Sequence, residues 1–111
     1  MKNTVIINGK DVPIEITAYT TLIYEDNFKG RNFFRDIENV IENDSMKFGL
    51  VTKFLWAAAK TADGNISSIE KWTKNIDLKE IIVASDIVIN LIYESIKSDS
   101  PKVTATAPKT D

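Results

Sequence analysis

Short β-branched segments open the chain, and apolar residues recur at helical spacing after them. Residues 4–7 and 12–16 are the β-branched segments, and Asn8-Gly9 lies between them. Asn and Gly tolerate the positive φ angles of a tight turn, so this pattern predicts a β-hairpin. Pro13 has no N–H and suits an edge or an outward-facing position. A lone hairpin is marginally stable in water and has to pack on other elements.

The rest of the chain predicts five helices from apolar periodicity and capping residues. The first expected helix runs from a cap at Thr20 or Thr21 to Gly30, and the second from a cap at Asn32 to a break at 43–45. The third runs from Met46 to about Ala62. A Ser67–Glu70 capping box starts a short fourth helix that contains Trp72, and an Asp77–Glu80 capping box starts the last helix, which runs to about Lys97. The predicted fold is therefore α+β, mostly α, with an N-terminal β-hairpin packed on a bundle of about five helices. Residues 1–97 form the expected domain. Ser, Pro, Thr, Lys and Ala dominate 98–111, which predicts a disordered C-terminal tail.

The last predicted helix carries apolar residues on two sides when each residue is rotated by about 100°. One broad face includes Leu78, Ile81, Ile82, Ser85, Val88, Ile89, Ile92 and Ile96. Val83, Ile87 and Leu91 follow an i, i+4, i+8 spacing on nearly the opposite side. A surface helix of a monomer needs one apolar stripe. Either this helix is central to the domain, or its second stripe contacts another chain.

Three aromatic residues are further candidates for partner contacts. Trp56 lies beside the narrow polar side of its helix, where it either folds over the edge of the domain or anchors an interface. Phe33 and Phe34 are adjacent, so a helix points them in different directions, one into the core and the other toward a candidate contact. The predicted partner-binding or oligomer interface comprises Trp56, Val83, Ile87, Leu91, Phe33 and Phe34.

Composition narrows the classes of function. The chain has 111 residues, 43% of them hydrophobic and 27% charged, which suits one globular domain. It contains no Cys and no His, so thiolate chemistry and the commonest general base are excluded. The segment Asp63–Glu70 is too short for an EF-hand calcium loop. We therefore expect a protein that is not an enzyme and has no metal site and no cofactor.

Charge and hydropathy bear on partners and location. The net charge is −2, without the basic excess that nucleic-acid binders usually show. No apolar run approaches the roughly 20 residues needed to cross a bilayer. We expect a soluble, intracellular protein that binds neither nucleic acid nor membrane.

Several segments within residues 3–97 resemble one known family. They are the hairpin turn Ile7-Asn8-Gly9-Lys10, the segment 24–28 (Tyr-Glu-Asp-Asn-Phe), the helix segment 55–62 (Leu-Trp-Ala-Ala-Ala-Lys-Thr-Ala) and the segment 69–72 (Ile-Glu-Lys-Trp). In this order they resemble the tail assembly chaperones of long-tailed phages that infect Gram-positive bacteria. The resemblance lies in the order and pairing of elements, and no catalytic motif is part of it.

The resemblance implies a non-enzymatic chaperone that binds the tape measure protein, keeps it soluble and self-associates into higher-order homo-oligomers. Such a protein acts in the host cytoplasm and is not in the mature virion. A longer product of a programmed ribosomal frameshift recruits tail tube protein. Pro101-Lys102 and Pro108-Lys109 are compatible with slippery codons, so we interpret this chain as the short product.

Two other interpretations remain open. A small helical phage regulatory or DNA-binding protein would need basic and amide side chains on one exposed helix face. Arg31 and Arg35 are the only arginines, and Lys53 with Lys60 forms a thin stripe. An adaptor domain would instead use the edge of its hairpin to bind an added strand.

Overall fold

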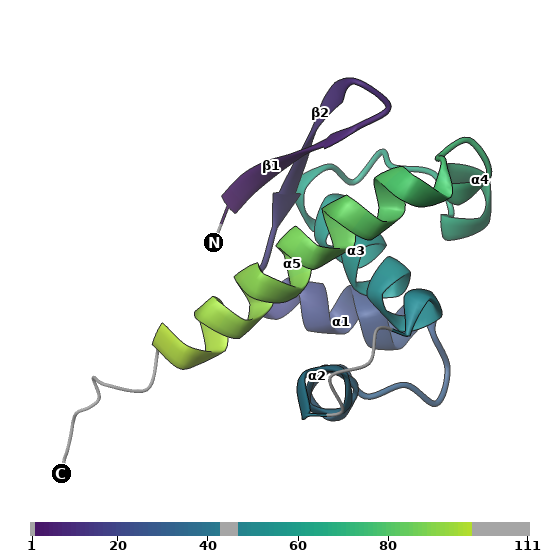
Figure 1. The fold of residues 1–111 in the computed structure, drawn as a ribbon. Coiled ribbons are helices and arrows are strands. Elements are labelled where there is room, and N and C mark those ends of the chain that lie inside the picture. The colour runs from purple at the N-terminus through teal and green to yellow at the C-terminus, as the bar shows by residue number, and fades with distance from the viewer. Residues whose placement is uncertain (1, 43–46, 99–111) are drawn as a thin grey trace, which may run out of the picture.

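The computed structural model describes residues 2–42 and 47–98. Within them, a hairpin of β1 (Lys2–Ile7) and β2 (Lys10–Glu15) precedes five helices: α1 (Ala18–Asn27), α2 (Phe33–Glu42), α3 (Phe48–Ala62), α4 (Ile69–Lys74) and α5 (Leu78–Ser98). This confirms the predicted α+β, mostly α fold. Figure 1 shows α5 crossing α3, with the hairpin lying along the outside of the helices. The predicted break at 43–45, the helix start at Met46 and the tail after Ser98 lie outside the described residues.

The hairpin has the turn that its sequence predicts. β1 and β2 are antiparallel, with Ile7 paired to Lys10, and the turn residues Asn8 and Gly9 have φ angles of 54° and 77°. The Asn8 N–H donates to Glu80 Oε1 at 2.8 Å, and its Nδ2 donates to the Asn75 carbonyl at 2.7 Å. The turn is therefore bound to the segment after α4 and to the first turn of α5.

The helix α3 is at the centre of the core. Its buried residues are Leu50, Val51, Phe54, Leu55, Trp56, Ala57, Ala58 and Ala59. It packs on α1, on α5 and on β2. The three alanines have no bulk beyond Cβ, so neighbouring elements approach α3 closely on several sides. This helix therefore positions α1, α5 and β2.

A polar group inside an aromatic cluster joins α1 to α2. The Tyr24 ring stacks on Phe54 with centroids 4.7 Å apart, and Phe33 packs edge-on to Tyr24 at 5.6 Å. The Tyr24 hydroxyl donates to Asp36 Oδ2 at 2.8 Å, and Arg31 Nε lies 3.6 Å from the same oxygen. Burial, followed by the hydrogen bond to Asp36, raises the pKa of Tyr24. The carboxylate is thus compensated by one hydroxyl and one cation.

Two predicted helix starts are confirmed or moved by capping contacts. Asn32 caps α2 as predicted, because its Oδ1 accepts from the Arg35 N–H at 2.9 Å. The first helix was expected to be capped by Thr20 or Thr21, which is wrong. Thr17 is the N-cap, and Thr20 completes the capping box by accepting from the Thr17 N–H at 3.0 Å. The Thr20 hydroxyl also reaches the Glu15 carbonyl, so the cap ties α1 to β2.

The capping box predicted for α4 is displaced by one residue, whereas α5 begins directly after Asp77 as predicted. Ser68, not Ser67, is the N-cap of α4, and its Oγ accepts from the Lys71 N–H at 3.4 Å. The Ser67 carbonyl accepts instead from Trp56 Nε1 at 2.9 Å, which holds that residue against α3. Glu80, expected to cap its own helix, accepts from Asn8 in the hairpin turn. Ser67 and Glu80, two residues of the predicted boxes, thus make tertiary contacts.

Candidate partner-binding surface

The helix α5 exposes apolar side chains along one side of its length. Its inner face is the buried row Ile81, Ala84, Ser85, Val88 and Ile92. Beside this row lie Leu78, Ile82, Tyr93 and Ile96, which are 66%, 36%, 44% and 43% exposed, and the half-buried Ile89. We call these five residues, Leu78, Ile82, Ile89, Tyr93 and Ile96, the α5 stripe. Four of them, Leu78, Ile82, Ile89 and Ile96, were expected on the core face; Ile89 packs partly against the core, and the other three are exposed.

The second stripe predicted on α5 is only partly open. Val83 is 56% exposed, whereas Ile87 and Leu91 are half-buried and pack against the core. The helix packs on α3 and also on β1. A helix that packs on two neighbours needs more than one apolar row. Packing within the domain therefore explains why Ile87 and Leu91 are apolar, and no partner protein is needed for them. Val83 is the residue of this row that stays exposed to a partner.

The aromatic candidates separate into one exposed residue and two buried ones. Phe34 is 56% exposed, whereas Phe33 is 2% and Trp56 is 3% exposed. Adjacent positions on α2 therefore do point differently, as predicted. The indole of Trp56 packs edge-on to Phe28 at 5.6 Å and donates to the Ser67 carbonyl, so the ring is unavailable to a partner in this structure. Trp56 supports the site only by holding the segment before α4.

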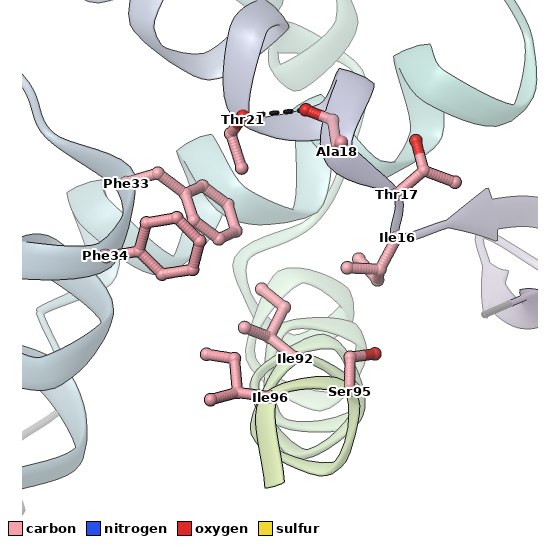
Figure 2. Close-up of a pocket in the computed structure, with 9 residues that line it drawn as sticks. All are labelled: Ile16, Thr17, Ala18, Thr21, Phe33, Phe34, Ile92, Ser95 and Ile96. Carbon is pink, nitrogen blue, oxygen red and sulfur yellow. Dashed lines mark hydrogen bonds between the residues drawn. The ribbon is translucent and has the colours of Figure 1, made fainter. Parts of the chain in front are cut away.

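An apolar groove connects the α5 stripe to Phe34. Figure 2 shows the Phe33 and Phe34 rings facing Ile92 and Ile96 across the space between α2 and α5. The groove has a volume of about 280 Å³ and is lined by Ile16, Thr17, Ala18, Thr21, Phe33, Phe34, Ile92, Ser95 and Ile96. The structure thus brings Phe33, Phe34 and Ile96 together and leaves Val83, Ile87 and Leu91 apart from them.

A spacing in the sequence indicates the α5 stripe. Leu78, Ile82, Ser85, Ile89, Ile92 and Ile96 follow alternating steps of four and three residues. This is the spacing by which a helix presents one seam to another helix. The fold buries Ser85 and Ile92 of that seam and leaves the other four at its outer margin. Tyr93 adds an aromatic ring there, with Lys97 Nζ 5.7 Å from its centroid.

The groove offers apolar contact and few polar groups. The hydroxyls at its margin are engaged locally: Thr21 Oγ1 donates to the Ala18 carbonyl at 2.7 Å, and Ser95 Oγ to the Leu91 carbonyl at 2.9 Å. Asp36, the buried carboxylate nearest in the chain to Phe34, is bound to Tyr24 and Arg31. This arrangement can hold an apolar side chain and presents no free acid, base or nucleophile toward it.

Metal sites and membrane-spanning helices are two further features for which the described part of the chain gives a result. Across residues 2–42 and 47–98, no group of three or more acidic residues is placed to hold a metal ion. Over the same ranges, none of the helices combines the length and apolar character needed to cross a membrane. Comparison with models of known protein families, with characterised proteins and with solved structures finds no match to this chain.

Proposed function

We propose that this chain is a non-enzymatic tail assembly chaperone of a long-tailed phage, which binds the tape measure protein and keeps it soluble while the tail is built. The α5 stripe is the observation that supports this proposal. Leu78 and Ile96, its two ends, are about 27 Å apart along the axis at 1.5 Å per residue. An apolar surface with this length and direction suits a second helix better than a small ligand.

The mechanism follows from where the apolar groups lie. A tape measure helix lays its apolar face along the α5 stripe and inserts a side chain into the groove between Phe34 and Ile96. Each contact removes apolar surface of both chains from water, at about 25 cal/mol per Å². The exposed side chains of the α5 stripe thereby cover apolar residues of the tape measure protein that would otherwise cause it to aggregate.

The remaining features of the proposal come from the resemblance of the sequence. The chain self-associates into higher-order homo-oligomers along the tape measure protein in the host cytoplasm and leaves before the virion is complete. A frameshifted longer product recruits tail tube protein. The codons in question encode residues outside the described part of the chain, and sequencing them for a slippery heptamer tests this point.

Co-expression with the tape measure gene from the same gene cluster tests the function. Ile96→Lys places a cation on the stripe and at the groove, and we expect it to lower the soluble, co-purifying tape measure protein at least fivefold. Val83→Lys is the matched control, since Val83 is similarly exposed on another side of the same helix. Both positions are at the surface, so each change should alter the free energy of unfolding by about 0.5 kcal/mol or less.

The two variants, the experiment without this chain and a gel-shift assay lead to different conclusions. Loss with Ile96→Lys alone supports the α5 stripe as the tape measure surface. Loss with Val83→Lys alone moves the contact to the side predicted from the sequence. Tape measure protein that is equally soluble without this chain contradicts the proposed function, and a retarded DNA band in a gel-shift assay would favour the regulatory alternative.

A further inference from the structure

The turn of the hairpin determines which backbone groups face outward. In a two-residue turn with positive φ at Asn8 and Gly9, the flanking pair Ile7 and Lys10 exchanges both its hydrogen bonds. Pairs then alternate along the ladder, so every second residue directs its N–H and C=O away from the other strand. The outward residues are Lys2, Thr4 and Ile6 on β1, and Asp11, Pro13 and Glu15 on β2.

The two edges of the hairpin differ in what they offer. On β2, Pro13 has no N–H to donate, and the Glu15 carbonyl accepts from Thr20 Oγ1 at 3.2 Å. On β1, the Thr4 N–H donates to the neighbouring Asn3 Oδ1 at 2.7 Å, a local bond that a new strand can replace. The outward backbone groups of Lys2 and Ile6 have no partner within the described part of the chain. The β1 edge is open, whereas the β2 edge lacks a donor at Pro13 and has its Glu15 carbonyl engaged.

The side chains on the outer face of β1 do not protect this edge fully. Ile6 is 62% exposed, and Lys2 and Thr4 are exposed beside it. A lysine is a common guard of an edge strand, whereas an exposed isoleucine next to unpaired backbone groups is a site for strand addition. The β1 edge is therefore a candidate site for an added strand.

We propose that the added strand is β1 of a second copy of this chain, antiparallel and related by a two-fold axis at Thr4. Only this register pairs all three outward residues: Thr4 with Thr4, and Lys2 of each copy with Ile6 of the other. The result is a continuous four-stranded sheet with strand order β2-β1-β1-β2. This inference rests on the self-association within the proposed function, and it names the surface that carries it.

Charge complementarity supports the second copy as the occupant. Asp11 lies opposite Ile6 within the hairpin, so Lys2 of the second copy comes two strands away from Asp11. Neighbouring strands are about 4.8 Å apart, and a lysine side chain spans most of the two strand spacings between Lys2 of one copy and Asp11 of the other. The two-fold axis creates this Lys2–Asp11 pair twice. Such an isologous contact uses the same patch on both copies.

Thr4→Pro tests the pairing with little change to the hairpin itself. Thr4 lies opposite Pro13, and its N–H points away from β2 and takes no part in the ladder of the hairpin, so the substitution removes only an outward donor. We expect the wild-type chain to be a dimer or larger in analytical ultracentrifugation, and Thr4→Pro to weaken dimerisation about tenfold or more. Thr4→Val is the control and should dimerise as the wild type does.

A charge exchange provides a second test if Thr4→Pro does not fold. Lys2→Glu should weaken dimerisation, and Lys2→Glu combined with Asp11→Lys should restore it. In a sample of mixed isotope labelling, the dimer should give a contact between the α-protons of Asn3 and Val5 of different copies. This contact confirms the register, and its absence in a dimer overturns it.

The outcomes distinguish this inference from the proposed function. A monomeric wild-type chain, or a dimer insensitive to both Thr4→Pro and the charge exchange, overturns the β1 pairing. Tape measure protein that still co-purifies with such a chain leaves the function standing. A β1 dimer whose tape measure binding is absent supports the pairing and contradicts the function.

Discussion

The helices α3 and α5 are both rich in apolar residues, but the fold covers them differently. On α3, Val51, Phe54, Leu55 and the three alanines are fully buried. On α5, Leu78 at the start and Ile96 near the end are 66% and 43% exposed. The cause is how far neighbouring elements enclose each helix, because α3 packs extensively on α1, α5 and β2, whereas the extensive contacts of α5 are with α3 and β1. Apolar surplus therefore contributes to folding on α3 and stays exposed on α5.

The same leucine truncation should separate the two helices most clearly. Leu55→Ala empties a fully buried position on α3, and we expect the free energy of unfolding to fall by about 2–5 kcal/mol. Leu78→Ala on α5 removes an exposed side chain, and the expected change is about 0.5 kcal/mol or less. Urea denaturation at a concentration where the chain is monomeric measures both. Equal losses would mean that α5 is as enclosed as α3.

Removing one hydroxyl beside α3 should have the next largest effect. The Tyr24 ring stacks on Phe54, and its hydroxyl donates to the buried Asp36. Tyr24→Phe keeps the stacking and leaves the carboxylate with Arg31 alone. We expect a loss of about 1–3 kcal/mol in the free energy of unfolding, measured by urea denaturation at neutral pH. Tyr93→Phe on α5 is the control, and it should be nearly neutral because that ring is at the surface.

The raised pKa of Tyr24 gives this prediction a pH dependence. The folded state favours the protonated phenol, which ionises in the unfolded chain near pH 10. Stability from this group is therefore fully present below about pH 10 and is lost as the pH rises toward the folded pKa. The difference in unfolding free energy between wild type and Tyr24→Phe should shrink above about pH 10. A difference that stays constant to higher pH would contradict the shift.

The sequence predicted the fold class because its local signals agree with one another. Asn8-Gly9 forms the expected turn, Asn32 caps α2, and the periodicity places all five helices. Two residues of the predicted capping boxes bind groups that are distant in the sequence. Glu80 binds Asn8 across the chain, and the Ser67 carbonyl binds Trp56, and neither partner is visible from local spacing.

The candidate surface was harder to predict than the fold. Periodicity gives the angle of a side chain around its helix, but it does not say which neighbour covers that angle. Val83 and Leu91 have the same spacing logic, yet only Val83 is more than half exposed. Leu78 and Ile96 share the apolar face with Ile92, and they become surface only because no described element covers that margin. The positions of α2 and β1 decide which side chains of α5 are covered. These positions depend on contacts between residues that are far apart in the sequence.

The smallest predicted effect comes from removing one hydroxyl on α3 and one on α5. The two changes should shift the free energy of unfolding in opposite directions. On α3, the Thr61 hydroxyl donates to the Ala57 carbonyl at 2.7 Å and lies 2.9 Å from that of Thr20. On α5, Ser85 is fully buried, and its Oγ has no hydrogen-bond partner among the described residues. Thr61→Val should lower the free energy of unfolding by about 1 kcal/mol, and Ser85→Ala should raise it by a similar amount. Urea midpoints of the two variants measure this, and a destabilised Ser85→Ala would show that α5 satisfies its buried polar groups as α3 does.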